Sequence, residues 1–449
     1  MTLKVLRTAL AACTAVAAAA GLLAPVAAAA PVSDPFYSYQ GGSLESEDPG
    51  TVLKTRTLPY HVANVATPIE ATQLLYRSND ALGRPVANVT SVLRPSNALP
   101  GKVVAYASFY DSLNPEDGPS RAVAGDTPIG TLTPSGRNVT FGGLANAQEP
   151  LLYGPLLAQG YTVVIPDTQG PQADFGAGPE YGKMTLDALR AARRSPKTGI
   201  SMADQIALMG YSGGAIATNL AAALAPSYAP EINAKLIGVA EGGLLANPAN
   251  NLRYASGSLG WSGVVGMAIV GLARAYDIDF SRYMSARAAD IVDHISDASI
   301  ANVFAQYPGL AWSDLVKPQY LNPNSIPEFV DVANKINLGT APVPTVPMFI
   351  GQAANGILEG TQPGGPGVGP GDGVMVAGDV RSLARRYCEA GLDIKYDQYD
   401  WASHTPGGAI WLPGALLWLN DRFNNQPAPN NCATIAPGNS LAPLQHAQS

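Results

Sequence analysis

Gly210-Tyr211-Ser212-Gly213-Gly214 is the stretch that decides the fold. An apolar run ends just before it, and a helix-forming run of small residues follows at 215–225. A sharp turn from a strand into a helix needs glycine two residues before and after an exposed serine, because a larger side chain would clash there. The pattern predicts that Ser212 is a nucleophile at such a turn. Alone it is weak evidence, because a chain with 47 glycines produces such patterns by chance.

Apolar runs of strand length alternate with helical patterns on both sides of this turn. The predicted strands are 102–108, 161–166, 205–209, 235–240, 346–351 and 394–399, and the predicted helices include 186–194, 215–225 and 379–390. This alternation is typical of a mostly parallel sheet that is covered by helices on both faces. The sequence therefore predicts the α/β class.

The domain organisation follows from the point where the alternation stops. Residues 245–340 contain helical patterns without a clear strand, so we predict a helical cap inserted into a core formed by 61–244 and 341–423. Such a cap would lie over the carboxyl edge of the sheet, where these folds place their sites. Residues 30–60 are predicted to form an extended N-terminal arm, and 424–449 a tail rich in Pro, Asn and Ala.

The N-terminal 29 residues have the pattern of a secretory signal peptide. Lys4 and Arg7 precede a long apolar stretch, and small residues lead to a cleavage site that we place after Ala29. A lipoprotein cleavage site at Cys13 is the alternative, but it would leave only a short apolar region in front of the cysteine. We therefore expect an exported, extracellular chain.

Charge and cysteine content narrow the classes of ligand. The formal net charge is −7 and basic runs are short, which argues against nucleic acid as a partner. Two cysteines follow the predicted leader, Cys388 and Cys432, and an even pair in an exported chain predicts a disulfide. Neither cysteine has a histidine at ligand spacing, so we predict no metal site.

A nucleophilic serine needs a histidine base, and the base needs a carboxylate that orients it. His404 follows the last predicted strand in a loop rich in Gly, Ser and Pro, where it can reach the edge of the sheet. The carboxylate is expected after the preceding strand, and Asp372 and Glu359 both lie there. Asp379 is explained by its place in the first turn of a helix. Position favours Asp372, which gives the chain order of the α/β-hydrolase fold, and Glu359 remains the alternative.

With these residues in place, the sequence resembles the secretory lipase family of α/β-hydrolases, which includes Candida antarctica lipase A and many actinobacterial exported lipases. The stretches that carry the resemblance are Tyr110-Asp111-Ser112 with Gly118-Pro119-Ser120; Gly160-Tyr161 through Pro166-Asp167 and Gly170; Leu186-Asp187-Ala188-Leu189-Arg190-Ala191 before the serine turn; and Asp372 through Cys388, Gly391 and His404. Together these stretches span nearly all of the chain after the predicted leader.

The resemblance implies that Ser212, Asp372 and His404 form a catalytic triad, because the spacing of 32 residues between the last two is similar to that of the family. The loop 355–371 is longer than the connection that is usual in the family. This difference leaves the choice of acid open between Asp372 and Glu359.

The resemblance also implies that Asp111 and the backbone N–H of Gly213 form the oxyanion hole. An ionised Asp111 would repel the developing negative charge, so it must contribute through its backbone N–H or as a protonated carboxyl. From the residues alone, an aspartate that forms a turn after a strand is an equal interpretation. The insertion 245–340 resembles the helical lid of the family, and its apolar residues either shape an acyl pocket or pack as core.

The function expected from this resemblance is that of a secreted carboxylic ester hydrolase, a lipase or esterase, which cleaves glyceride or other lipid esters through an acyl-serine intermediate. No cofactor and no protein partner are expected, and contact with a lipid interface would be transient. One alternative is another acyl hydrolase or an acyltransferase on the same scaffold. A second is a catalytically inactive module that binds a surface.

Overall fold

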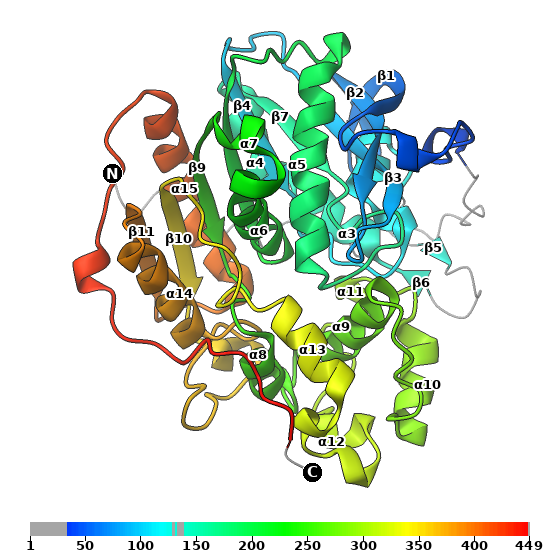
Figure 1. The fold of residues 1–449 in the computed structure, drawn as a ribbon, viewed down its shortest axis with the longest axis vertical. Coiled ribbons are helices and arrows are strands. Elements are labelled where there is room, and N and C mark those ends of the chain that lie inside the picture. The colour runs from blue at the N-terminus through cyan, green and yellow to red at the C-terminus, as the bar shows by residue number, and fades with distance from the viewer. Residues whose placement is uncertain (1–33, 128–130, 133–138, 448–449) are drawn as a thin grey trace. The chain divides into compact units, whose positions relative to one another are not determined.

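A nine-stranded sheet is the centre of the computed structural model, which describes residues 34–127, 131–132 and 139–447. The predicted signal peptide 1–29 lies outside the described residues. The strand order is β1-β2-β3-β7-β4-β8-β9-β10-β11, and Figure 1 labels all of these strands except β8. Strands from β7 to β11 in this order pair in parallel, and β1, β2, β3 and β7 pair antiparallel. The predicted α/β class is confirmed.

The strands of this sheet are β1 (Val52–Val62), β2 (Val65–Asn79), β3 (Pro85–Leu93), β4 (Lys102–Ala107), β7 (Thr162–Pro166), β8 (Gln205–Tyr211), β9 (Leu236–Gly242), β10 (Met348–Ala353) and β11 (Ile394–Tyr399). The helices that cover it are α2 (Pro119–Ala124), α4 (Pro150–Ala158), α5 (Gly178–Arg194), α6 (Gly213–Tyr228), α14 (Ala377–Glu389) and α15 (His404–Phe423). A separate two-stranded sheet pairs β5 (Thr131–Leu132) with β6 (Val139–Thr140).

Two buried apolar layers hold helices on the two faces of the sheet. Successive residues of β8 alternate between them, because side chains along a strand point to opposite faces. Ile206 and Leu208 belong to the layer that α5, α6 and α14 complete, and Ala207 and Met209 belong to the layer of α4 and α15. A strand that is buried on both faces reads as a continuous apolar run, which is why β8 could be predicted.

The antiparallel side of the sheet was not predicted strand by strand. The expected boundary between arm and core at residue 60 falls inside β1, so the last part of the predicted arm belongs to the sheet. β1 is an edge strand with alternating partly exposed and exposed positions, and it contains Pro59. Short apolar runs are absent from such a strand, since one of its faces meets solvent.

The prediction that His404 lies in a loop was wrong. His404 is the first residue of the helix α15. This helix was not predicted, because proline and glycine are poor residues for a helix interior and it contains Pro406, Gly407, Gly408 and Pro413. Trp411 and Leu419 of this helix are fully buried against the sheet. Burial of that apolar face outweighs the low intrinsic helix propensity.

Residues 245–340 contain helices and no sheet strand. They form α8 (Pro248–Ala255), α9 (Ser262–Ala275), α10 (Ala286–Ile295), α11 (Ile300–Val303), α12 (Trp312–Leu315) and α13 (Pro327–Lys335). α11 is a single short turn, because Phe304 leaves the helical conformation. Met267, Ile291 and Val303 form part of an apolar cluster within this segment. We call residues 245–340 the cap.

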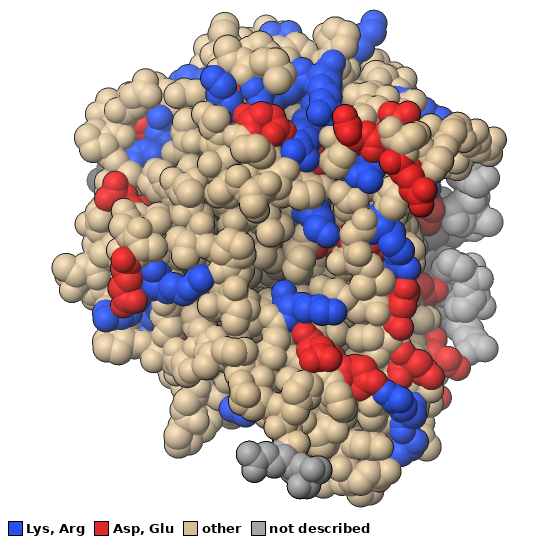
Figure 2. All heavy atoms as spheres, viewed as in Figure 1, with Lys and Arg blue, Asp and Glu red and all other residues tan. Residues whose placement is uncertain are grey.

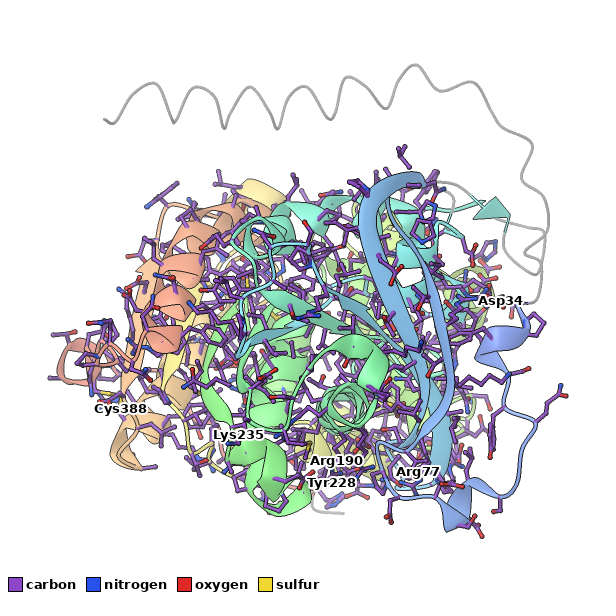
Figure 3. All side chains as sticks on the ribbon, turned by 90° about the horizontal axis from the view of Figure 1, so that it is seen from above. Asp34, Arg77, Arg190, Tyr228, Lys235 and Cys388 are labelled. Carbon is purple, nitrogen blue, oxygen red and sulfur yellow. A yellow bond between two sulfur atoms is a disulfide. The ribbon has the colours of Figure 1, made fainter. Side chains whose placement is uncertain are left out.

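The tail follows the surface of the fold, and a disulfide fixes it. Cys388 at the end of α14 is bonded to Cys432, as predicted. Beyond the disulfide, Asn439 donates its backbone N–H to the carbonyl oxygen of Gly378, at 3.0 Å. Figure 3 shows Cys388 on the side of the fold opposite Asp34.

Charged side chains of both signs share the surface of the fold. On the face shown in Figure 2, Lys and Arg lie among Asp and Glu, and wide areas carry neither. No helix among residues 34–127 and 139–447 is long and apolar enough to cross a membrane.

Candidate active site

Ser212 lies on the predicted turn between β8 and α6. Its backbone has φ 56° and ψ −121°, a strained conformation for a residue with a side chain. A Cβ atom at Gly210 would lie 2.3 Å from the carbonyl oxygen of Gly214, and one at Gly214 would lie 2.1 Å from that of Ala107. The steric requirement for the two glycines is therefore confirmed, and the serine hydroxyl is presented at the carboxyl edge of the sheet.

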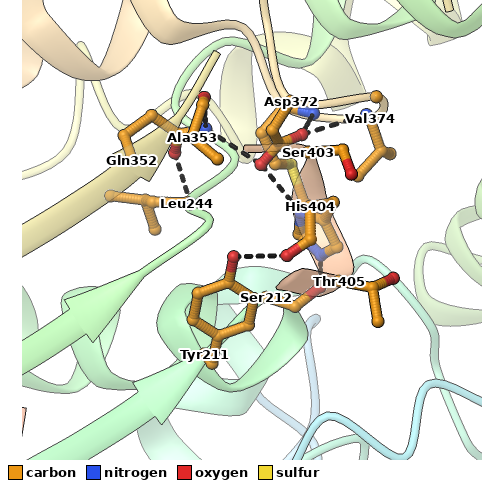
Figure 4. A network of polar contacts seen from close by, with 12 residues as sticks. Tyr211, Ser212, Leu244, Gln352, Ala353, Asp372, Val374, Ser403, His404 and Thr405 are labelled. Carbon is orange, nitrogen blue, oxygen red and sulfur yellow. Dashed lines mark hydrogen bonds and ion pairs between the residues drawn. The ribbon is translucent and has the colours of Figure 1, made fainter. Parts of the chain in front are cut away.

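Three side chains from distant parts of the chain form one line of hydrogen bonds, which Figure 4 shows. Nε2 of His404 lies 2.8 Å from Oγ of Ser212, and its Nδ1 lies 2.7 Å from Oδ2 of Asp372. If the proton is on Nδ1, it is donated to the carboxylate, and Nε2 is free to accept the serine proton. The histidine and the aspartate are buried, so this arrangement is shielded from water.

Asp372 is oriented by several donors. Its Oδ1 accepts the backbone N–H groups of Val374 and Met375, at 3.1 and 2.7 Å. Its Oδ2 accepts Nε2 of Gln352 at 2.9 Å besides the histidine. The backbone N–H of His404 also donates to the Asp372 carbonyl, at 2.8 Å. These bonds fix the carboxylate relative to the ring that it faces.

Glu359, the alternative acid, takes a different place. Its Oε1 accepts Oγ–H of Ser403 at 3.0 Å and the backbone N–H of Thr405 at 2.9 Å. Its Oε2 accepts Nε1–H of Trp261 at 2.8 Å. The structure therefore brings Asp372, and not Glu359, to Nδ1 of His404.

Carboxylates around His404 decide its charge. Burial alone would lower the pKa of His404, but Asp372 raises it through its charge and its hydrogen bond. Glu359 and, in its ionised form, Asp111 raise it further, and the net pKa lies above the ordinary value of 6.5. The ring accepts a proton readily, as a base must, and becomes charged as the pH falls through that raised pKa.

Asp111 lies against the serine turn. Its backbone has a positive φ of 32°, and Oδ1 accepts Nε2–H of Gln169 at 3.1 Å. A Cβ atom at Gly213 would lie 2.1 Å from that oxygen, so a side chain at position 213 would displace the carboxyl. Burial raises the pKa of Asp111 to about 7, against the opposing effects of His404, the Gly213 N–H and Gln169. The carboxyl is therefore substantially protonated near neutral pH.

An apolar cavity of about 140 Å³ opens onto the serine. Ser212, Gly213 and Asp111 lie at its core side. The cap supplies most of the remaining wall, which includes Trp261, Val264, Val265, Ala268, Ile269, Leu272, Phe280, Ile300, Trp312, Phe329 and Val332. Cap residues thus meet the serine at the predicted edge of the sheet. The sequence could not distinguish these wall positions from ordinary core.

Two residues that contribute to the site, Gln352 and Tyr211, were not predicted from the sequence. Gln352 bonds Asp372, and Tyr211 donates its hydroxyl to the carbonyl oxygen of His404 at 2.7 Å. Tyr211 belongs to the serine pattern, but the pattern does not indicate which group its hydroxyl binds. The described residues contain no group of three or more His, Cys, Asp or Glu side chains that could hold a metal ion.

Comparisons with known proteins agree with this geometry. Residues 137–431 match the family model described as secretory lipase. Lipase 1 of Candida albicans is 30% identical over 91% of this chain and 84% of its own length. A probable inactive lipase of Mycobacterium tuberculosis is 28% identical over 88% of this chain and 83% of its own length.

Solved structures show the same fold. Candida antarctica lipase A superposes with a TM-score of 0.76 at 24% identity, over 92% of this chain and 91% of that one. Its closed state gives a TM-score of 0.75 at 25% identity, over the same shares of the two chains. With the family match covering more than half of its residues, the chain belongs to the secretory lipase family and is by class a lipase or esterase.

Proposed function

We propose that this chain hydrolyses carboxylic esters through an acyl-enzyme on Ser212, with His404 as general base and Asp372 as the acid that orients it. The observation that carries the proposal is the line of hydrogen bonds from Ser212 Oγ to His404 and on to Asp372, at 2.8 and 2.7 Å. This line begins at the wall of an apolar cavity, where an acyl chain has room.

The proposed reaction has two matched halves. His404 Nε2 takes the proton of Ser212 Oγ while the oxygen attacks the ester carbonyl, and a tetrahedral oxyanion forms. His404 then gives the proton to the leaving alkoxide, so the alcohol departs and the acyl-serine remains. Water repeats both steps with the same base, releases the carboxylic acid and restores the serine. Asp372 stabilises the imidazolium in each half.

The oxyanion is proposed to be held by the backbone N–H of Gly213 and by Asp111 in its protonated form. The position of Asp111 against Gly213 and its raised pKa support this assignment. A protonated carboxyl donates a hydrogen bond, whereas the ionised form would repel the oxyanion. Asp111 would therefore work below its pKa of about 7 and hinder the reaction above it.

Asp111 is expected to give the enzyme an alkaline limit that asparagine removes. In the unmodified chain, kcat/KM should fall as the pH rises through about 7, because Asp111 ionises. Asp111→Asn keeps a donor and cannot ionise, so that fall should disappear. Asp111→Ala should lower kcat by about 100-fold, as loss of an oxyanion donor does. Profiles of kcat/KM against pH for the three proteins test this, and an unchanged alkaline fall in Asp111→Asn contradicts it.

The acyl part of the substrate is proposed to lie in the cavity beneath the cap. A cavity of about 140 Å³ is similar in size to an engineered void of about 150 Å³ that binds benzene, which corresponds to about six carbon atoms. The cap wall, with Leu272 and Phe329, is mostly apolar and carries no charged side chain among the residues that line the cavity, so it suits an alkyl chain. We therefore propose esters of short to medium fatty acids as substrates.

Labelling with a fluorophosphonate tests the proposed nucleophile directly. The probe should attach to Ser212, as peptide mass spectrometry would locate it, and ester hydrolysis should decline in proportion to labelling. A series of p-nitrophenyl esters and triglycerides, with alcohol acceptors added, gives the preferred acyl length and the share of transfer. Hydrolysis that survives full labelling of Ser212 contradicts the proposal, and preferential formation of new esters indicates an acyltransferase.

A further inference from the structure

Glu359 connects the cap to the helix that carries His404. Its carboxylate accepts hydrogen bonds from Ser403 and Thr405, the two neighbours of His404 in the chain, at 3.0 and 2.9 Å. Ser403 is the N-cap residue of α15, and its side chain makes no capping bond within its own helix. Glu359 therefore supplies the anionic cap of α15 from another loop, at the positive end of the helix dipole.

The other oxygen of Glu359 holds a cap residue. Trp261 lies at the start of α9 and donates Nε1–H to Oε2 at 2.8 Å. Its indole ring packs edge-on against His404, with ring centroids 5.2 Å apart, and only 6% of its surface is exposed. The Glu359 carboxylate thus fixes the Trp261 indole, which packs beside the His404 ring, and also the backbone next to His404.

Gly373 leaves space for this connection. It follows Asp372 directly and has a φ of +134°. A Cβ atom there would lie 2.7 Å from Nε1 of Trp261 and 3.0 Å from Oε2 of Glu359. The loop that carries the acid of the proposed triad is thus shaped to let the indole and the carboxylate meet. The glycine at this position is a separate observation that supports the contact between Trp261 and Glu359.

We propose that Glu359 is a positioning residue that couples the seating of the cap, through Trp261, to the position and basicity of His404. The inference rests on the proposed function, since it assigns a role only if His404 is the base. When the cap is seated, Trp261 and Glu359 hold the imidazole on its line to Ser212. Without the Trp261 contact, the imidazole loses the ring beside it and Glu359 loses one of its three donors.

Charge gives Glu359 a second effect that a purely structural contact would lack. The groups that face His404 are Asp372, Glu359, Asp111 and the hydroxyl of Tyr211, which stays neutral because burial raises its pKa. Glu359 adds to the raised pKa of His404. The base must be neutral to act, so this pKa sets the acid limb of kcat/KM. Without the Glu359 charge, the pKa falls and the limb moves to lower pH.

Two substitutions separate position from charge. Trp261→Phe removes the N–H donor but keeps an aromatic ring and the Glu359 carboxylate, so kcat should fall about tenfold with an unchanged acid limb. Glu359→Gln should lower kcat similarly and also move the acid limb to lower pH. The double variant should be little worse than the poorer single one, because both break the same connection. Exposed Trp401→Phe and Glu389→Gln are the matched controls and should leave both quantities unchanged.

Rates are measured on p-nitrophenyl butyrate and divided by the concentration of active sites that a fluorophosphonate titrates, so partial misfolding does not count as lost catalysis. Additive losses in the double variant overturn the coupling, and an unmoved acid limb in Glu359→Gln overturns the effect on basicity. A lower melting temperature with normal kcat per site would reduce Glu359 to a structural residue and also overturn the proposal. If the unmodified chain neither hydrolyses the ester nor reacts with the probe, the proposed function itself fails.

Discussion

Ser212→Ala is expected to lower kcat for ester hydrolysis by about 10⁶-fold, to the rate that binding and the oxyanion donors alone support. The large effect follows from the loss of the only atom that forms the acyl bond, and His404 then has no proton to take. Folding should survive, because alanine is smaller than serine and the strained φ of 56° comes from the glycines and the turn around it.

The measurement is kcat on a p-nitrophenyl ester, with the melting temperature as a check of folding. Ser227→Ala is a matched control, because Ser227 is exposed near the end of α6, the helix that begins beside Ser212. It should keep full activity. A Ser212→Ala protein that folds and hydrolyses the ester at the normal rate would falsify the assignment of the nucleophile.

Asp372→Asn is expected to lower kcat by about 10⁴-fold while the fold is kept. An asparagine amide can turn its N–H toward Nδ1 of His404, which then carries its proton on Nε2 and cannot accept one from Ser212. Val374 and Met375 still find an acceptor in the amide oxygen, so the loop keeps these two bonds and loses the one from Gln352. The effect is much larger than the expected tenfold loss in Glu359→Gln, and the comparison decides which carboxylate is the acid of the triad.

Asp379→Asn is the control for this substitution. Asp379 is also buried, seven residues along the same segment, where it accepts amide groups from Asn250 and Asn439 at 2.9 and 2.8 Å. Its replacement should change stability but leave kcat per active site nearly unchanged, because it touches no residue of the triad. Equal losses in Asp372→Asn and Asp379→Asn would show that the first acts through the fold and would remove Asp372 from the mechanism.

The probable inactive relative raises the question of whether this chain keeps the chemistry. In this structure the distances from His404 to Ser212 and to Asp372 are those of ordinary hydrogen bonds. The cavity reaches the serine hydroxyl, so a substrate can meet it. These observations favour an active enzyme, and the Ser212 experiments decide the matter.

The local sequence was sufficient to predict an element whose conformation depends on a single local condition. β8 could be predicted because it is buried on both faces, and the serine turn because only glycine fits at 210 and 214. The helix α15 could not be predicted, since its glycines and prolines oppose a helix that only burial of Trp411 and its neighbours stabilises. The edge strand β1 was missed for a related reason, because solvent on one face removes the apolar run.

The choice between Asp372 and Glu359 shows the same division. Both follow β10 in the chain, and both lie near His404 in space, so order and spacing could rank them only by position. Nδ1 of His404 contacts Asp372, whereas the backbone N–H of Thr405 donates to Glu359. This difference depends on how the loop 355–373 folds over the start of α15.

By itself, the sequence determined the α/β class, the serine turn and the histidine that faces Ser212, because each depends on local sterics, on burial pattern or on a scarce residue type. Tertiary structure alone decided which acid faces the base, which cap side chains line the cavity and how Trp261 and Glu359 meet beside His404. The physical reason is that these contacts join residues that are not neighbours in the chain, 32 positions apart for Asp372 and His404 and 98 for Trp261 and Glu359, or choose between equal groups on one loop. Only packing in three dimensions makes such choices.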